Sequence, residues 1–319
     1  MALTIAVTGA DGFIGRAVCV ELEGRRHRVL RIARAADAPR DPGLRVVPDI
    51  ASAAGLETVL AGCDAIVHLA ARAHVLKEPE PDPEAAFERV NVGGTMRLAE
   101  AAVRAGLKRF VFVSSIGVNG SSSAGAPFTE ADSPAPAEPY ARSKLRAERT
   151  LQTAASGSLE VVIVRPPMVY GPGVKGNFLR LLSLVDSGLP LPLGSVRNRR
   201  SVIGVENLAG LLALCSEHDA AAGELFLAAE PEVHSTPDLL REIACGLGRP
   251  DRVFAFPFGP LRLAARVGGF VGLLDKLCGS LEVSSSKAQR LLGWRPTVSF
   301  ADGIASTAGW YRERPHAAG

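Results

Sequence analysis

Hydrophobic and polar positions along this chain alternate between short apolar runs and longer amphipathic stretches. Apolar runs rich in Val and Ile predict buried strands, and stretches with the periodicity of a helix predict helices with one buried face. The predicted strands cover residues 3–7, 28–33, 44–48, 65–69, 110–114 and 160–165. The predicted helices cover residues 12–22, 56–60, 85–105 and 140–154.

Strands that alternate with helices and are apolar on both faces are typical of an α/β fold with a Rossmann-like, doubly wound parallel sheet. After residue 165 the alternation breaks into short segments, separated by Pro190, Pro192, Pro231, Pro237, Pro257 and Pro260. We predict a dinucleotide-binding domain over 1–165 and a smaller C-terminal substrate-binding lobe mainly over 166–319, with some segments returning to the first domain. Loops at 121–139 and 171–177 are expected to border the active site.

Composition narrows the class of protein. Hydrophobic residues make up 47% of the 319 residues and the formal net charge is +3, with one tight basic cluster at Arg197, Arg199 and Arg200. The absence of a basic stripe argues against a nucleic-acid-binding face. No apolar run in the sequence reaches membrane-spanning length. The most apolar late stretch, 267–274, is expected to be ordinary core; the alternative is that it lines a pocket or contacts a partner. Residues 1–7 predict a strand and not a signal peptide, so we expect a cytoplasmic protein.

The five cysteines give no sign of a metal or redox site. They are Cys19, Cys63, Cys215, Cys245 and Cys278, and no two lie within four residues of each other. This spacing excludes a zinc knuckle or a CxxC pair. We expect buried thiols in a reducing compartment and no metal site.

A glycine-rich turn follows the first predicted strand and opens the first helix. It runs Thr8-Gly9-Ala10-Asp11-Gly12-Phe13-Ile14-Gly15. Gly9 permits the tight turn, Gly12 allows backbone to approach a pyrophosphate, and Gly15 allows close packing of helix on sheet. The first amides of the helix would bind the phosphates. We predict cofactor contacts at Gly9, Asp11, Gly12, Phe13, Ile14 and Gly15.

The end of the second strand discriminates between NAD and NADP. NAD-binding sites place an acid there for the ribose 2′-hydroxyl, whereas an arginine accommodates a 2′-phosphate. Ala33 stands in the acid's place, with Arg34 beside it. NADP(H) is therefore the favoured cofactor. NAD(H) remains the alternative, because Asp37 and Asp41 lie close behind and Arg34 is equally explained as a solvated loop residue.

The next two strands end in further candidate cofactor contacts. Asp49 would accept a hydrogen bond from the adenine amino group, and Ile50 would cover the ring. His68 continues an apolar strand, so we expect a buried, hydrogen-bonded histidine and not a ligand. The small residues after it would allow backbone to pass close to the cofactor; they follow Leu69 and are Ala70 and Ala71.

Tyr140 and Lys144 form the candidate catalytic pair. Residues four apart share one face of a helix, so the Lys144 ammonium is expected near the Tyr140 hydroxyl, where it would lower the pKa of the phenol. Tyr140 would then exchange a proton with the substrate as hydride moves, and Lys144 would also bind the nicotinamide ribose. Ser115, at the end of the strand 110–114, would bind the reacting oxygen. Ser114 is the alternative for that role.

Together these motifs resemble those of the extended short-chain dehydrogenases/reductases, the NAD-dependent epimerase/dehydratase family. The resemblance extends over nearly the whole chain. It rests on the glycine turn, His68-Leu69-Ala70-Ala71, Asn91-Val92-x-Gly94-Thr95, Ser114-Ser115, Tyr140-xxx-Lys144, Arg165-Pro166-xxx-Tyr170-Gly171-Pro172 and Lys287-Ala288-xx-Leu291-Leu292-Gly293-Trp294. It implies a catalytic set of Ser115, Tyr140 and Lys144. It also implies cofactor-side roles for Asn91, Ser114 and Pro167.

The resemblance implies a nucleotide-sugar substrate. Asn177 matches a residue that contacts the nucleotide diphosphate, and Arg200 matches a phosphate-binding arginine. Two departures stand out. Met168 replaces an asparagine found in many members, and no second diphosphate arginine lies near residues 281–283. Arg262, Arg266 and Lys276 are the candidate substitutes.

The subtype is narrowed by the residues after Ser115. Sugar 4,6-dehydratases of this family carry an Asp-Glu pair there, where this chain has Ile116 and Gly117. The chain most resembles bacterial 4-reductases of UDP-4-keto-6-deoxy-N-acetylhexosamines, used in surface polysaccharide synthesis, and UDP-hexose 4-epimerase is the alternative. A non-catalytic NAD(P)-binding regulatory protein is a third hypothesis.

The family resemblance also implies a homodimer, formed through helices 85–105 and 140–154. The Ala and Leu residues of these helices are expected to be exposed.

Overall fold

The centre of the molecule is a parallel β-sheet. The computed structural model describes residues 2–34, 43–73, 82–123, 125–154, 157, 159–269 and 271–314. Within these residues seven strands pair in the order β3 (Leu44–Val46), β2 (Arg28–Ala33), β1 (Thr4–Thr8), β4 (Ala65–His68), β5 (Arg109–Val113), β6 (Glu160–Arg165) and β9 (Leu225–Leu227). Every pairing is parallel. This is the Rossmann-like order, with its switch point between β1 and β4, and it confirms the predicted α/β class.

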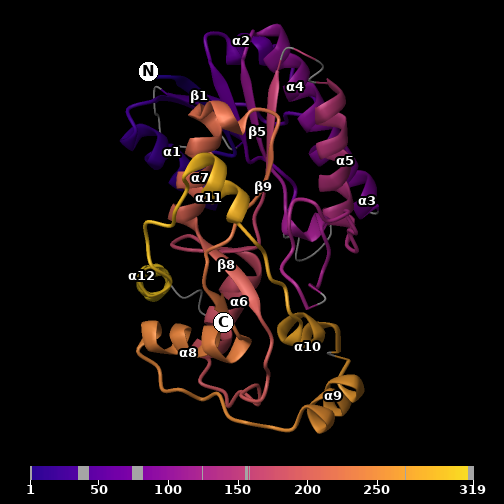
Figure 1. Cartoon of the computed structure of the whole chain (residues 1–319), viewed down its shortest axis with the longest axis vertical. Helices are drawn as coiled ribbons and strands as arrows, with labels where there is room; N and C mark the ends of the chain where they lie inside the picture. Colours follow the sequence, from indigo (N-terminus) through magenta and orange to yellow (C-terminus); the bar gives the residue numbers. More distant parts are fainter. Residues whose placement is uncertain are drawn as a thin grey trace.

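Helices cover both faces of the sheet (Figure 1). One face packs against α1 (Phe13–Gly24) and α7 (Val205–Glu217), with α11 (Ser286–Leu292) beside them. The other face packs against α2 (Leu56–Leu60), α4 (Gly94–Arg104) and α5 (Pro139–Ala154). The strands are buried on both sides by these layers, which is why their sequences are apolar at consecutive positions.

The predicted helix 85–105 is interrupted. It divides into α3 (Pro83–Phe87), a π-helical turn (Glu88–Gly93) and α4. Asp82 begins it by accepting hydrogen bonds from the amides of Glu84 and Ala85. A π turn widens the helix by one residue and is common at functional sites. Here it contains Asn91, whose side chain is buried.

A second, smaller lobe is built around the strands β10 (Val233–His234), β8 (Arg200–Gly204) and β7 (Met168–Tyr170). Its core includes residues of α6 (Gly176–Asp186), α8 (Thr236–Leu247) and α12 (Phe300–Glu313). Two further helices, α9 (Phe258–Val267) and α10 (Val271–Cys278), lie at its edge (Figure 1). Short 3₁₀ turns occur at Ile116–Val118 and Asp219–Ala221. Although β9 and α7 come after residue 166, they pack in the first domain; the division at 165/166 itself stays a prediction.

Several expectations are corrected. The strand predicted at 44–48 ends at Val46, because Pro48 offers no amide to the ladder. Cys245 is exposed and not buried, because it lies on the outer side of α8. The stretch 267–274 is not uniformly core: Val267 is 84% exposed, whereas Leu274 is buried. Among the described residues, no helix is long and apolar enough to span a bilayer.

The helices expected to form a dimer interface bury the residues on which that expectation relied. Leu98, Ala99, Ala147 and Leu151 pack against the sheet. The outer surfaces carry ion pairs instead, Arg142 with Glu84 and Arg146 with Glu88. Of the Ala and Leu residues in these two helices, only Ala85 is exposed, so the premise fails for nearly all of them, and the dimer itself stays a proposal.

Candidate active site

The carboxyl ends of the parallel strands meet at one edge, where the glycine turn lies. Gly9 has φ +68°, and a β-carbon there would lie 3.1 Å from the amide nitrogen of Ala70. A β-carbon at Gly15 would lie 2.1 Å from the carbonyl oxygen of Gly9. Gly12 precedes α1 without a side chain to cap it. The turn therefore holds backbone close to backbone and leaves the first amides of α1 open to an anion.

The other predicted cofactor residues lie along the same edge. Ala33 is buried and Arg34 is exposed directly after β2, while Asp37 and Asp41 fall outside the described residues. Asp49 accepts hydrogen bonds from the amide of Ala51 and the hydroxyl of Ser52, so it already shapes its own turn. Ile50 is buried and packs against Gly94. A β-carbon added at Gly94 would lie 3.1 Å from Cγ1 of Ile50. Leu69, Ala70 and Ala71 follow β4.

His68 is a buried histidine with both ring nitrogens engaged. Nδ1 lies 2.7 Å from the Thr8 hydroxyl and Nε2 lies 3.0 Å from the Thr95 hydroxyl. Thr95 donates to the carbonyl of Asn91, so it accepts from Nε2, and the Thr8 hydroxyl donates to Nδ1. Burial, assisted by the nearby Lys144 charge, lowers the pKa of His68 to about 3. The neutral ring therefore links Thr8 of the glycine turn to Thr95, whose hydroxyl is bonded to the π turn.

The catalytic candidates converge where β5 ends. Lys144 is buried, and its Nζ donates a 2.8 Å hydrogen bond to the carbonyl of Val113. A β-carbon at Gly117 would lie 3.4 Å from the Ser115 hydroxyl and 3.3 Å from the β-carbon of Ala141. Ser115 is therefore close to Ala141 in the first turn of α5, the turn that also carries the half-buried Tyr140.

The two candidate serines differ in their surroundings. The Ser115 hydroxyl accepts a 3.2 Å hydrogen bond from the amide of Gly117 and keeps its own proton free to donate. The Ser114 hydroxyl is buried and has no hydrogen-bond partner within the part of the chain that the structure describes. A buried orphan hydroxyl at this edge is a polar atom suited to a bound ligand.

The expected lowering of the phenol's pKa does not occur in the structure. Burial raises the pKa of Tyr140 to about 12. Burial also lowers the pKa of Lys144 to about 8, opposed by the negative charge of Glu148. Sequence spacing places Lys144 on the correct face of the helix, but its ammonium reaches the Val113 carbonyl. Desolvation therefore governs both groups.

Two buried contacts hold α5 in place. Asn91 donates from its side-chain amide to the Ser143 hydroxyl (3.0 Å), and its oxygen accepts from the amide of Arg72. Glu148 forms a two-point ion pair with Arg165 at 2.9 and 2.5 Å. Both partners of this pair are buried, so the guanidinium and carboxylate satisfy each other. These contacts link the catalytic helix to the segment after β4 and to β6.

The predicted substrate residues lie in the smaller lobe. Asn177 is exposed in the first turn of α6, and Pro167 is buried just before β7. Arg200 begins β8, and its Nη1 donates to the carbonyls of Lys276 (2.6 Å) and Gly279 (3.0 Å). Burial lowers the pKa of Arg200. Two proposed substitutes, Arg262 and Arg266, are exposed on α9, and Lys276 pairs with Glu138.

Comparison with known proteins identifies the family. The sequence pattern of the NAD dependent epimerase/dehydratase family matches residues 5–229. The chain belongs to this family. It is 38% identical over 312 residues to a UDP-glucose 4-epimerase of Vibrio cholerae, covering 97% of this chain and 95% of that protein.

Solved structures of similar proteins align with almost the entire chain. MoeE5 in complex with UDP-glucuronic acid and NAD is 27% identical, with a TM-score of 0.77 and coverage of 97% of this chain and 99% of that one. DesIV, a dTDP-glucose 4,6-dehydratase from Streptomyces venezuelae with NAD bound, is 29% identical, with a TM-score of 0.78 and 98% of both chains covered. The chain is thus an NAD-dependent enzyme of the epimerase/dehydratase family.

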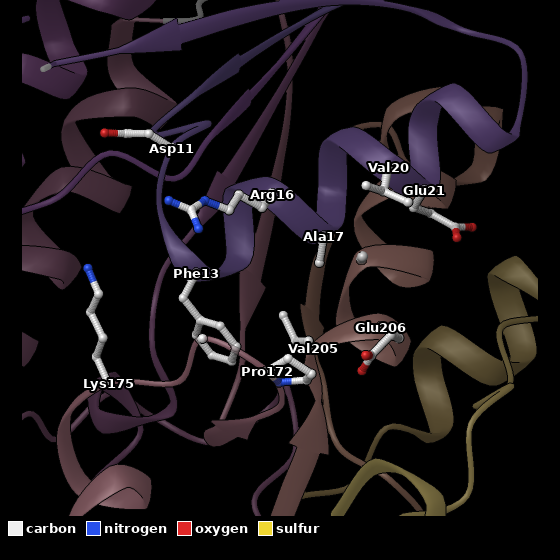
Figure 2. A pocket seen from close by; sticks show the side chains of 12 residues that line it. Asp11, Phe13, Arg16, Ala17, Val20, Glu21, Pro172, Lys175, Val205 and Glu206 are labelled. Atoms are coloured by element: carbon white, nitrogen blue, oxygen red, sulfur yellow. The ribbon is translucent and has the colours of Figure 1, made fainter. Parts of the chain in front are cut away.

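The fold also brings Arg16, Lys175 and Phe87, which the sequence motifs did not indicate, close to predicted site residues. A cavity of about 360 Å³ flanks the glycine turn, and Figure 2 shows Asp11, Phe13 and Arg16 on one side of it and Lys175 on another. Arg16 and Lys175 thus bring positive charge from both lobes to the same place. Tyr140 is flanked by Phe87, with ring centroids 6.1 Å apart. No local pattern could reveal that Arg16 and Lys175 line one cavity or that Phe87 flanks Tyr140, because the two members of each pair are far apart in sequence.

Proposed function

We propose that this enzyme catalyses NAD(P)-dependent hydride transfer at C4 of a UDP-linked hexose. The observation that carries the proposal is the placement of Tyr140, Lys144 and Ser115 at the end of β5, on the sheet edge that holds the glycine turn. The relatives support the UDP-sugar class, because one is a UDP-glucose 4-epimerase and another binds UDP-glucuronic acid.

The residues at this edge fit a dinucleotide. The uncapped amides of α1 suit a pyrophosphate, and the orphan hydroxyl of Ser114 suits a polar group of a bound ligand. A bound nicotinamide would donate or accept the hydride. Lys144 would orient the nicotinamide ribose, and Asn91 would hold the catalytic helix against the cofactor side.

The proton transfer would belong to Tyr140. Because burial raises the pKa of this phenol to about 12, Tyr140 keeps its proton and is suited to donate it to O4 as a C4 ketone is reduced. Ser115 would donate a hydrogen bond to the same oxygen. Asn177 and Arg200 would bind the nucleotide diphosphate, Arg200 with the guanidinium donors that the Lys276 and Gly279 carbonyls leave free.

Reduction of a UDP-4-keto-6-deoxy-N-acetylhexosamine for surface polysaccharide synthesis is the activity that the end of β2 favours. Buried Ala33 stands in the place of the acid that would bind a ribose 2′-hydroxyl, and exposed Arg34 suits a 2′-phosphate. NADP(H), exchanged at each turnover, matches a reductase. We further propose a cytoplasmic homodimer.

UDP-hexose 4-epimerisation is the second candidate, favoured by the Vibrio cholerae relative. It uses the same residues in both directions with retained cofactor. A 4,6-dehydratase is disfavoured, because buried Ile116 and Gly117 stand where elimination needs an acid and a base.

One assay separates these activities. The protein is incubated with NADPH or NADH and either a UDP-4-keto-6-deoxy-N-acetylhexosamine or a UDP-hexose, while NAD(P)H absorbance and product structure are followed. A reductase consumes one NADPH per 4-keto sugar reduced. An epimerase interconverts UDP-hexoses without net consumption. Cofactor binding without turnover of any sugar would instead assign a regulatory role.

A further inference from the structure

An exposed apolar surface surrounds α9, away from the proposed active site. Every residue from Phe254 to Pro260 is exposed. The side chains of Phe254, Phe256 and Phe258 are 44%, 36% and 42% accessible. Phenylalanine side chains are normally buried. Three that are exposed within five residues indicate that another surface covers this segment.

The outer face of α9 continues this surface. Leu261 and Ala265 are partly buried against the core of the smaller lobe. Residues two apart on a helix lie on roughly opposite faces, which places Leu263 and Val267 farthest from that core. They are 65% and 84% exposed. The side of α9 directed to solvent is thus apolar, the reverse of an ordinary surface helix.

Basic residues border this apolar surface. Between Asp251 and Asp275 the chain has three arginines, Arg252, Arg262 and Arg266, and no acidic residue. All three arginines are exposed, and none forms an ion pair within the described part of the chain. We call these three arginines, together with Phe254, Phe256, Phe258, Leu263 and Val267, the α9 surface.

We propose that the α9 surface docks on an anionic lipid bilayer. Apolar side chains bordered by arginines are the pattern of helices that lie in a membrane interface without spanning it. In Figure 1, α9 lies at one extremity of the smaller lobe, beyond α10, so it can meet a flat surface without obstruction by the Rossmann domain. The proposal is independent of the substrate proposed above.

Charge favours a lipid surface over a second copy of this chain. A twofold interface would place the same patch against itself, so three arginines would face three arginines without an acid from this segment. An anionic bilayer supplies the complementary charge along its whole plane. The apolar side chains would then enter the headgroup boundary.

The test is co-sedimentation of the full chain with vesicles of phosphatidylcholine alone and of phosphatidylcholine mixed with phosphatidylglycerol. We expect binding to the anionic vesicles only, weakening as salt is added. Each arginine near such a surface contributes roughly fivefold to affinity. Arg262→Glu/Arg266→Glu should therefore weaken vesicle binding by roughly tenfold or more. Leu263→Gln/Val267→Gln should also weaken vesicle binding by roughly tenfold or more, and at every salt concentration, because its contribution is apolar and not ionic.

Matched controls keep the outcome specific. Arg97→Glu/Arg149→Glu changes two exposed arginines on α4 and α5, and Leu291→Gln changes an exposed apolar side chain on α11. Both should bind vesicles like the unaltered protein. The proposal is overturned if the unaltered protein ignores anionic vesicles at low salt, or if the α9 variants bind as well as the controls. A dimer that Leu263→Gln/Val267→Gln converts to monomer, with no vesicle binding, would show that a second copy covers the surface.

Discussion

Asn91 donates a 3.0 Å hydrogen bond to the hydroxyl of Ser143, the residue that precedes Lys144. The same Asn91 side chain bonds both the amide and the carbonyl of Arg72, just after β4. Ser143 in turn donates to the carbonyl of Tyr140. One buried side chain in the π turn therefore couples the position of the catalytic helix to the backbone on the cofactor side.

Replacement of Asn91 should impair catalysis through position. Asn91→Ala leaves the Arg72 amide without its acceptor, and we expect kcat to fall roughly tenfold with a smaller change in KM for the sugar. Loss of a buried hydrogen bond should also lower the free energy of unfolding by about 1–3 kcal/mol. Steady-state kinetics and denaturant melts measure both effects.

A double-mutant cycle separates this role from general destabilisation. If Asn91 acts on the helix through Ser143, Asn91→Ala and Ser143→Ala should be non-additive in kcat, with the double variant close to Asn91→Ala alone. Strictly additive effects on kcat would show that Ser143 does not transmit the influence of Asn91.

Tyr140→Phe should lower kcat at least roughly a hundredfold, the scale of lost general acid–base catalysis. The ring and its contact with Phe87 are retained, so the dissociation constant for the cofactor should change little. Tyr311→Phe is the matched control, since its hydroxyl bonds Ser183 in the smaller lobe. Near-normal turnover by Tyr140→Phe would show that Tyr140 is not the group that transfers the proton.

Lys144 should set the alkaline limb of the pH profile. Because burial lowers its pKa to about 8, the ammonium loses its proton as the pH rises through that value. Tyr140, with a pKa of about 12, stays protonated there. We expect kcat/KM for the cofactor, which reports the cofactor-free enzyme, to fall about tenfold per pH unit above pH 8.

Lys144→Arg tests this assignment. A guanidinium remains protonated throughout the range, so the fall near pH 8 should disappear, even if the overall rate is reduced. An unchanged alkaline limb in Lys144→Arg would assign that limb to another group.

Arg34 should determine the preference between cofactors. A guanidinium can meet a 2′-phosphate with two parallel hydrogen bonds, and a charge-assisted bond contributes about 1.5–3 kcal/mol, or roughly ten- to a hundredfold in affinity. The protein should bind NADPH more tightly than NADH, and Arg34→Ala should erase most of the difference. Arg28→Ala, at the opposite end of β2, is the control. Equal or tighter binding of NADH by the unaltered protein would show that Arg34 does not give the site a preference for NADPH.

Homodimer formation should involve the outer surface of α4 and α5. Met96 is 42% exposed on α4. An ion pair joins Arg146 of α5 to Glu88 of the π turn that precedes α4. Light scattering at micromolar concentration should give the mass of a dimer, and Met96→Glu should shift it toward monomer, because a carboxylate would be buried at the contact. Leu291→Glu on α11 should leave the dimer intact. A monomer under these conditions contradicts the prediction.

Local patterns were sufficient for the fold class and for the main chemical motifs. Apolar runs identified six of the seven described strands of the parallel sheet to within one or two residues, because burial on both faces leaves a direct trace in the sequence. They did not indicate β9, which joins the sheet from the part of the chain after residue 165. The glycine turn and the Tyr140–Lys144 spacing were also visible in the sequence, for a different reason. A tight turn and a shared helix face depend only on neighbours along the chain.

Other features were decided only when distant segments came together. The pKa of Tyr140 rises because partial burial of the side chain disfavours the charged phenolate. Asn91 turns inward because a π turn interrupts the predicted helix. Arg16 and Lys175 share a cavity because two lobes meet there.

The amino-acid sequence by itself determined six of the seven described strands of the sheet, the glycine turn and the helix face that carries the catalytic pair, since each follows from a local pattern over a few residues. Tertiary structure alone decided which side chains are buried and what they contact. Val267 shows the difference: its apolar stretch predicted core, yet it is 84% exposed because α9 turns Leu261 and Ala265 toward the protein. Desolvation and contact depend on the whole chain, and a local pattern does not contain them.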